Sequence, residues 1–304
     1  MRSEWKKYTV QELIDLEMLD EPLDGNHGSI HPKATDYVDE GVPFIMANNL
    51  VNGVVDLDGC AFISEEQAKT LRKGFAKPGD VLLTHKATIG RTAIVPDTYE
   101  TIILTPQVTY YRVKRGIDNR YLKYYFDSPV FQMTLNNWAG SGSTRAYLGI
   151  TAQRKLPVLL PPYNEQRKIA DILGVFDRKI QLNAEINENL LQQAGAVFDK
   201  LYEKSSNRQP FTSLIKVLGG GTPKTGNPDF WDGPIPFFTP KDVGTPYTFR
   251  TEKYISESGL AHCNSRLYQK DTTFVTARGT VGKISLAGTP MAMNQSCYAL
   301  VSDV

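Results

Sequence analysis

LPPYNEQRKIADILGVFDRKIQLNAEINENLLQQAGAVFDKLYEK (residues 160–204) predicts one long helix between two pieces that are rich in short strands and turns. Pro161-Pro162 favours an extended start, and Asn164 is placed to cap a helix that begins near Glu165. An amphipathic helix on a domain core is the alternative. Against it, about 40 helical residues would span about 60 Å, longer than such a helix needs.

Apolar side chains along this segment are spaced alternately by four and three residues, as in a coiled coil. Two asparagines lie next to each other at the middle of this seam, where buried Asn lowers stability but fixes register and partner. The predicted helix-pairing seam consists of Ile169, Leu173, Phe176, Ile180, Asn183, Asn187, Leu190, Ala194, Val197 and Leu201. A seam of this length needs a second helix, and nothing else in the chain supplies one of similar length.

Short motifs recur in the same order on both sides of the helix, which predicts two copies of one domain. VPFI at 42–45 returns as IPFF at 235–238, and THKATIGRTAI at 84–94 returns 192 residues later as TARGTVGKISL. QVTY at 107–110 resembles QSCY at 295–298, an offset of 188.

Each copy is expected to be mixed α/β. In the first copy, β-branched and aromatic runs bounded by turn residues predict strands at 81–84, 92–95 and 108–113. Residues 9–16 and 119–131 have helical patterns, the second ending near Ser128-Pro129. The predicted fold class is α+β, with a first domain at 1–160, a spacer helix at 161–206 and an incomplete second domain at 207–304.

Composition fits an intracellular protein without an active site of its own. The chain has 304 residues, a net charge of +1 and three scattered cysteines. That cysteine pattern suits reduced thiols in the cytoplasm, and no apolar run approaches the length of a membrane span. The four histidines show no metal-ligand spacing, and no catalytic triad or cofactor loop stands out. We therefore expect no enzyme activity and no metal or cofactor on this chain.

Several of these segments together resemble the specificity subunit of type I restriction–modification systems. LPPYNEQRKIADIL is similar to the Leu-Pro-Pro-x-x-Glu-Gln-x-x-Ile-Ala segment that opens the family's first spacer helix. GGTPKTGNPDFWDGPIPFFTPKDV (220–243) and DGNHGSIHPK (24–33) look like openings of its target-recognition domains. The resemblance covers essentially the whole chain, but the expected copy of residues 117–204, with the end of the second domain and a second helix, is missing from this sequence.

The resemblance implies a DNA-recognition subunit that is not itself catalytic. Each target-recognition domain would read one half of a bipartite site in double-stranded DNA, and the helix would space the domains. Expected partners are two modification (methyltransferase) subunits, docked on the helix, and restriction (translocase and nuclease) subunits. S-adenosylmethionine, ATP and Mg are expected on those partners. The helix also allows self-association.

Candidate DNA-binding residues fall into three groups. The repeated turns carry cations that suit phosphates, whereas positions that differ between the copies suit base reading, since Asn can bond adenine and Lys can reach guanine. The turn residues are Lys86, Arg91, Arg278 and Lys283. The differing positions are Asn48, Asn49, His85, Lys241 and Asp242, and Ser143, Thr144 and Arg145 are candidates for backbone contacts.

Two other function classes remain open at this point. A complete fused methyltransferase–nuclease would need a cofactor motif and an Asn-Pro-Pro-Tyr loop, whereas this chain has Leu160 at the first position. A truncated remnant could instead act as a protein-interaction module that binds modification subunits without specific DNA reading. A test of DNA binding with the modification subunit present distinguishes the two roles, because a specificity subunit would bind a bipartite site and the interaction module would not.

Overall fold

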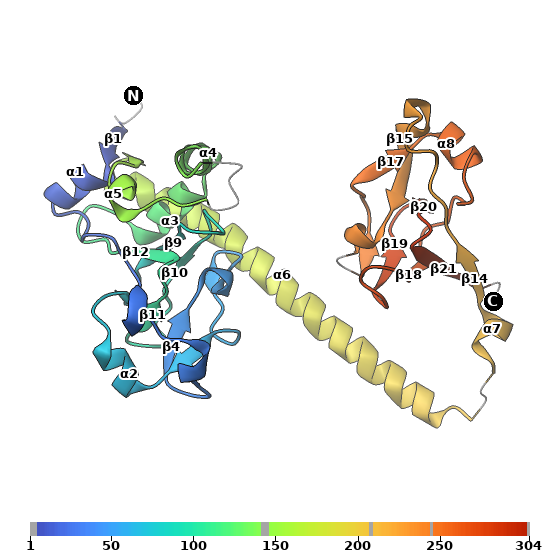
Figure 1. Ribbon diagram of the computed structural model, residues 1–304, viewed down its shortest axis with the longest axis horizontal. Coiled ribbons are helices and arrows are strands. Elements are labelled where there is room, and N and C mark those ends of the chain that lie inside the picture. Colours follow the sequence, from blue (N-terminus) through green and yellow to red (C-terminus); the bar gives the residue numbers. More distant parts are fainter. Residues whose placement is uncertain (1–4, 141–145, 207–208, 244–245, 303–304) are drawn as a thin grey trace. The chain divides into compact units, whose positions relative to one another are not determined.

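The computed structural model describes residues 5–140, 146–206, 209–243 and 246–302. The chain forms two compact units, Met1–Gln192 (unit 1) and Gln193–Val304 (unit 2), and the helix α6 (Tyr163–Lys204) runs from one into the other (Figure 1). The predicted class, two sheet-rich α/β parts and one long helix, is confirmed. The domain limits 1–160, 161–206 and 207–304 remain predictions.

The described residues of unit 1 form two main sheets and two strand pairs, in the orders β10-β9-β12-β2, β3-β7-β4-β11-β8, β1-β13 and β5-β6. Its strands are β1 (Lys6–Thr9), β2 (Leu23–Asp24), β3 (Tyr37–Val38), β4 (Val42–Ile45), β5 (Leu50–Val51), β6 (Val54–Val55), β7 (Ala61–Ile63), β8 (Phe75–Ala76), β9 (Val81–Thr84), β10 (Thr92–Ile94), β11 (Ile102–Leu104), β12 (Val108–Tyr111) and β13 (Pro157–Leu160). Before α6 come α1 (Val10–Asp15), α2 (Glu65–Thr70), α3 (Asn119–Asp127), α4 (Pro129–Trp138), α5 (Ile150–Gln153) and the 3-10 turns η1 (Gly28–Ile30), η2 (Ala34–Asp36) and η3 (Ala47–Asn49).

Unit 2 repeats the two main sheets in the orders β14-β21-β18-β19-β16 and β17-β15-β20. Its strands are β14 (Lys216–Gly219), β15 (Trp231–Phe238), β16 (Tyr247–Thr248), β17 (Lys253–Ile255), β18 (Thr273–Thr276), β19 (Ile284–Ala287), β20 (Ala292–Met293) and β21 (Cys297–Val301). Its short helices are α7 (Phe211–Leu214), α8 (Glu257–Ala261), η4 (Pro228–Phe230) and η5 (Pro240–Asp242).

The strand registers establish which residues correspond in the two units. Leu83 on β9 lies opposite Thr109 on β12, and its counterpart Val275 on β18 lies opposite Tyr298 on β21. Thr109 therefore corresponds to Tyr298, 189 residues later, and the predicted offset of 188 is wrong by one residue. A shift of one residue moves a side chain to the other face of a sheet, so this correction decides which side chains are equivalent.

Both faces of the β9–β12 pair are buried in unit 1. Leu82 and Tyr110 enter one core cluster, whereas Leu83 and Tyr111 enter another, which α3 and α4 cover with Leu122, Phe126, Phe131 and Leu135. Burial on both faces explains the continuous apolar runs VLLT and VTYY. The predicted helix at 119–131 ends at Asp127. Ser128 then caps α4 by accepting a hydrogen bond from the Phe131 amide, so a new helix begins at Pro129.

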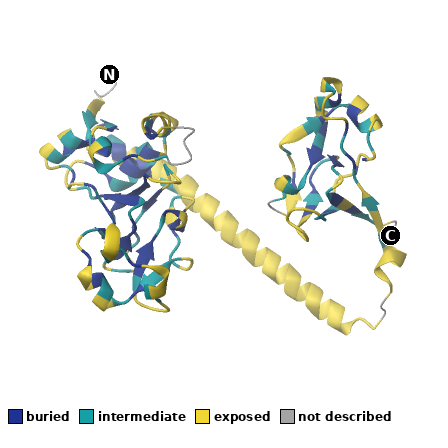
Figure 2. Cartoon of the chain, viewed as in Figure 1, coloured by how far each residue is buried: buried dark blue, intermediate teal, exposed yellow. Residues whose placement is uncertain are grey.

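In unit 2 the face that matches the α3-covered face is open in the described residues. Val217, Ile284 and Tyr298 are 46%, 62% and 47% exposed. The opposite face is buried with Phe274 and Ala299 (Figure 2). Unit 2 thus has one packed core on this sheet where unit 1 has two.

Buried contacts anchor the first turns of α6 to unit 1. The Gln166 side chain is 1% exposed; its Oε1 accepts from the Asp118 amide at 3.0 Å, and its Nε2 donates to Gly116 O and Pro161 O at 3.0 and 2.9 Å. Ala170 is buried in the same core. The helix begins at Tyr163, so Asn164 lies within the first turn and is not the cap.

Charged side chains extend this anchor by two turns. Arg120 on α3 pairs with Asp171 at 2.8 Å. Lys123 Nζ and Tyr124 Oη lie 3.2 and 2.8 Å from Asp177 Oδ2. Lys123 is nearly buried, which makes this pair less screened than a surface ion pair. The direction of α6 relative to unit 1 is therefore held between Gln166 and Asp177.

Two glycine substitutions test this packing. At Gly25 a Cβ would lie 1.8 Å from Leu104 O, so Gly25→Ala should lower the free energy of unfolding by about 1–3 kcal/mol or more. Gly195 on α6 has nothing within 4 Å of a Cβ, so Gly195→Ala should stabilise the helix by up to about 1 kcal/mol. Urea unfolding followed by circular dichroism measures both, and equal effects of the two substitutions would contradict the packing described.

Candidate nucleic-acid interface

The repeated turns after β9 and β18 have the same hydrogen bonds. Thr84 Oγ1 accepts from the Arg91 amide at 2.9 Å, and Thr276 Oγ1 accepts from the Lys283 amide at 3.0 Å. The Gly90 and Gly282 amides donate to the carbonyls of these same threonines, both at 2.9 Å. The φ angles of Gly90 and Gly282 are +90° and +81°, a conformation that other residues rarely adopt. The repeated motif is therefore a structural turn with the same backbone conformation in both units.

Four predicted cations extend from these turns and are exposed: Lys86, Arg91, Arg278 and Lys283. In unit 1 they line different pockets. Arg91 donates to Leu50 O at 3.3 Å and lines a pocket of about 580 Å³ with Lys123 and Asp127. Lys86 lines a separate groove of about 320 Å³. The two cations of one turn therefore do not form a single site.

Each of the 3-10 turns η3 and η5 carries two predicted DNA-binding residues, one that holds the turn together and one that is exposed. Asn49 Oδ1 accepts from the Met46 amide at 3.0 Å, and Asp242 Oδ2 accepts from the Thr239 amide at 2.7 Å. Asn49 is also buried and donates to Gly59 O. These contacts argue against base reading by Asn49 and make capping the role of Asp242. Their neighbours are exposed: Asn48, and Lys241, which lies 3.7 Å from Glu252.

His85 is fully buried, which argues against direct contact with DNA. Its Nδ1 bonds to Leu148 O at 3.1 Å, and its Nε2 lies 4.0 Å from Asp24. Burial lowers the pKa of His85, so the ring is neutral at pH 7. Ser143, Thr144 and Arg145 lie outside the described residues.

Asp24 is the centre of a polar cluster beneath the surface of unit 1. It accepts hydrogen bonds from Lys73 and from His27, the latter at 2.9 Å. Burial raises the pKa of Asp24, but these hydrogen bonds outweigh it and the pKa lies below its usual value. The strand registers place Gly219 at the position of Asp24, and the turn alignment places Ala277 at that of His85.

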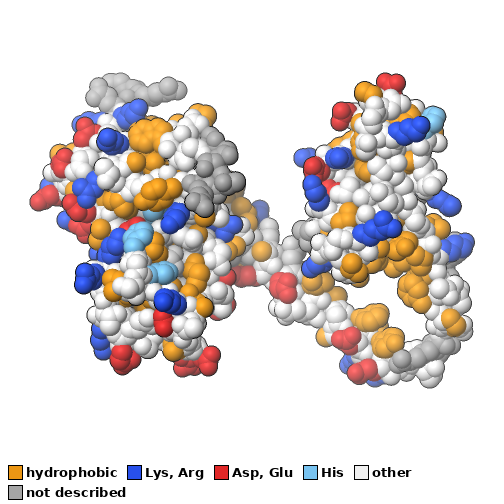
Figure 3. Space-filling view, viewed as in Figure 1, with side chains coloured by type: hydrophobic (Ala, Val, Ile, Leu, Met, Phe, Trp, Pro, Cys, Tyr) orange, Lys and Arg blue, Asp and Glu red, His pale blue; other side chains and the backbone are white. Residues whose placement is uncertain are grey.

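Each unit has an open groove between its 3-10 turn and its repeated turn. The groove of unit 1 is lined by His27, Gly28, His31, Tyr37, Met46, Lys86, Thr105, Pro106 and Gln107. The groove of unit 2, of about 370 Å³, is lined by Thr239, Pro240, Lys241, Glu252, Lys253, Arg278, Gly279, Asn294 and Ser296. Histidine side chains lie beside lysine and arginine on one face of unit 1 (Figure 3). Sequence reasoning missed most of these residues, because it matched Gln107 with Gln295 where the strand registers match it with Ser296, and because it did not compare the remaining loops.

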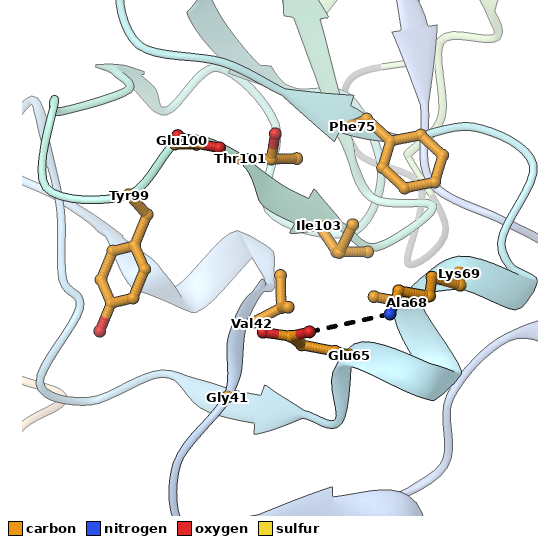
Figure 4. Close-up of a pocket in the computed structure, with 10 residues that line it drawn as sticks. All are labelled: Gly41, Val42, Glu65, Ala68, Lys69, Phe75, Tyr99, Glu100, Thr101 and Ile103. Carbon is orange, nitrogen blue, oxygen red and sulfur yellow. Dashed lines mark ion pairs between the residues drawn. The ribbon is translucent and has the colours of Figure 1, made fainter.

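A larger pocket of unit 1, about 620 Å³, contains none of the predicted residues. Val42, Ala68, Phe75 and Ile103 form its apolar wall, and Glu65 and Lys69 pair at 3.8 Å on its rim (Figure 4). Its lining is mainly apolar and offers few donors for a nucleic acid.

The exposed apolar surface of α6 is broader than the predicted seam (Figure 2). Ile169 packs against the core of unit 1, so this first seam residue is engaged within the unit. Leu173, Phe176 and Ile180 are 37%, 59% and 66% exposed, as the seam requires. Further exposed apolar side chains on α6 are Ile172, Val175, Leu182, Ile186, Leu191, Phe198 and Tyr202. In the first half of the helix these lie one residue before seam positions, including the two central asparagines.

Within the described ranges, no group of three or more His, Cys, Asp or Glu side chains is placed to bind a metal ion. The part of the chain that the structure describes also has no helix with the length and hydropathy of a membrane span.

A family model described as the type I restriction modification DNA specificity domain matches residues 2–192 and 210–303. The chain is 36% identical over 83 residues to the type I restriction enzyme MjaIX specificity subunit of Methanocaldococcus jannaschii. That match covers 26% of this chain and 19% of the relative. A second relative, the EcoR124I/EcoR124II specificity subunit of Escherichia coli, is 25% identical over 180 residues, 55% of this chain and 44% of that protein. Each match thus covers less than half of the relative's length.

The fold resembles the crystal structure of a type I restriction–modification S subunit from M. genitalium. The TM-score is 0.55 at 16% sequence identity, with 99% of this chain and 73% of that chain covered. At this identity the likeness concerns the fold alone.

The buried histidine makes stability depend on pH. Because the pKa of His85 is lowered in the folded state, acid protonates the unfolded chain first. Stability should therefore fall as the pH drops below about 6.5. His85→Ala, which introduces the residue of unit 2, should reduce this slope between pH 7.5 and 5.5 in urea unfolding. Burial also lowers the pKa of His31, so part of the slope should remain. An unchanged slope in the variant would contradict the assignment.

Proposed function

The chain belongs to the type I restriction–modification DNA specificity family, and from this we propose that it reads DNA sequence for a type I restriction–modification complex. Each unit would recognise one half of a bipartite site in double-stranded DNA. The chain itself would carry out no chemistry. Methyl transfer and cleavage would belong to the modification and restriction subunits, which would act with it in the cytoplasm.

One observation carries this proposal: the two units share a hydrogen-bonded frame but present different side chains from it. The repeated turns use the same threonine and glycine bonds in both units. The 3-10 turns use the same capping bond, yet expose Asn48 in one unit and Lys241 in the other. A protein that reads two different half-sites needs a common frame that positions it on DNA. It also needs variable side chains, because contacts with base edges carry the sequence information.

The role proposed for α6 is to space the units and to dock partners. Its 42 residues correspond to about 63 Å of helix. That length exceeds one turn of B-DNA, about 34 Å. The apolar face is wider than one coiled-coil seam, which favours contact with two partner surfaces at once. One would be a second helix along the predicted seam, and the other a modification subunit.

The exposed face of α6 also favours the alternative, a module that binds modification subunits without reading DNA. Both roles predict a complex with the modification subunit. They differ only in whether that complex prefers a DNA sequence.

Selection from a duplex library with two randomised half-sites tests the main proposal. The full chain, alone and with its modification subunits, should enrich a bipartite sequence and shift it in gel electrophoresis. Specific sites should bind at least about 10³-fold more tightly than random duplexes. A stable complex with modification subunits that enriches no sequence would favour the alternative and refute DNA reading.

A double substitution on the seam tests the role of α6. Leu173→Asp with Ile180→Asp should abolish assembly, because unpaired carboxylates at a buried apolar contact are strongly unfavourable. Size-exclusion chromatography with light scattering measures self-association and capture of modification subunits.

The matched control places the same residue on the polar face of α6, with Gln181→Asp and Gln192→Asp. These side chains are exposed, and Glu185 and Glu188 on the same helix accept their hydrogen bonds. The control should assemble normally. Intact complexes with the Leu173/Ile180 variant would refute the seam.

A further inference from the structure

The grooves beside Lys86 and Arg278 occupy the same place in the two units, as backbone hydrogen bonds show. The His85 amide donates to Gln107 O at 2.9 Å, and the Ala277 amide donates to Ser296 O at 2.8 Å. Gln107 and Ser296 are therefore equivalent wall positions. Lys86 and Arg278 follow the two donor residues directly, so each groove has a cation at the same point.

Two further pairs complete the correspondence. The Thr105 amide donates to Ile45 O and the Asn294 amide to Phe238 O, both at 3.0 Å. Thr105 and Asn294 thus lie at the same point of the wall. Met46 and Thr239 match in the same way, since each accepts from the last residue of its 3-10 turn, at 3.0 and 2.9 Å. In each of these four pairs, one residue lines the groove of unit 1 and its equivalent lines the groove of unit 2.

At these equivalent positions the side chains differ in all but the cation. Unit 1 presents Gln107 beside His27, His31 and Tyr37, and burial lowers the pKa of His31. Unit 2 presents Asn294 and, beside the equivalent positions, two further lysines, Lys241 and Lys253, with Glu252 3.7 Å from Lys241. The frame and one charge are common, whereas the hydrogen-bonding pattern is specific to each unit.

The wall of the unit 1 groove also contains an unused polar atom. Thr105 is 3% exposed, and its Oγ1 has no hydrogen-bond partner in the described residues. Buried polar atoms are nearly always paired, and an unpaired one requires an explanation. Because Thr105 lines the groove, this unpaired atom lies next to it.

Building on the proposed function, we infer that the two grooves are the sites where each unit reads a base edge in the major groove of DNA. The Gln107 amide in unit 1 and the Lys241 ammonium in unit 2 are the specificity-determining groups. A side-chain amide matches the N6 and N7 atoms of adenine, and an ammonium group matches the N7 and O6 acceptors of guanine. Lys86 and Arg278 supply the charge that both units share.

The experiment compares Gln107→Ala and Lys241→Ala in the full chain with modification subunits, by selection from the duplex library. Each variant should lose about tenfold discrimination at one or more base pairs. The two losses should fall in different half-sites, and the other half should keep its wild-type preference. Lys241 is exposed and only loosely paired, so its removal leaves the fold intact.

Lys69→Ala is the matched control, since this lysine of unit 1 lies on α2 at the apolar pocket and should change no base preference. Far-ultraviolet circular dichroism and the melting temperature verify that each variant is folded. If Gln107→Ala unfolds, Gln107→Ser replaces it, because serine is the equivalent residue of unit 2. A wild-type complex without sequence preference refutes the proposed function. A wild-type preference that both groove variants retain, or losses in both halves at once, overturns the inference about the grooves.

Discussion

The side chain of Gln166 is the contact on which the direction of α6 depends. It is almost fully buried, and its amide bonds three backbone groups that belong to two segments, at Gly116–Asp118 and at Pro161. Leaving those groups unpaired in the interior would cost about 1–3 kcal/mol each. Pro161-Pro162 delivers the chain in an extended form, and the helix begins at Tyr163, so the amide reaches these groups within its first turn. The Leu-Pro-Pro-x-x-Glu-Gln pattern is thus an attachment, in which Glu165 also accepts a bond from Trp5 at 3.1 Å.

Past Asp177 the described part of α6 is exposed, so its stability there rests on helix propensity and local pairs until something covers its apolar face. The contrast between the anchored and exposed parts separates two tasks along one helix. Residues such as Gln166 and Ala170 fix its start in unit 1. Residues such as Phe176 and Ile180 remain available for partners.

The sequence alone predicted the elements that local patterns determine. The long helix, the duplicated turns and the strands at β9, β10 and β12 follow from periodicity and glycine placement. Burial was harder to predict, because it depends on segments that meet only in the folded chain. Asn49 and His85 had suitable chemistry for base reading, but contacts with Gly59 and Leu148 place them inside. No sequence pattern signals such contacts.

Two other errors have the same physical origin. The offset of 188 matched residue types in β12 and β21, whereas strand pairing sets the correspondence at 189. The loops that complete the grooves, with Thr105 and Gln107 in unit 1, share little with Asn294 and Ser296. Their equivalence is carried by backbone hydrogen bonds, which residue types do not report.

The open sheet face of unit 2 has a practical consequence for the chain in water. This face carries the exposed apolar side chains of Val217, Ile284 and Tyr298, on three strands of one sheet. In unit 1 helices cover the matching face. Exposed apolar surface of this kind promotes aggregation when nothing shields it. Unit 2, more than unit 1, should therefore limit the concentration at which the isolated chain stays dispersed, and surface-active additives that coat flat apolar faces should extend that range.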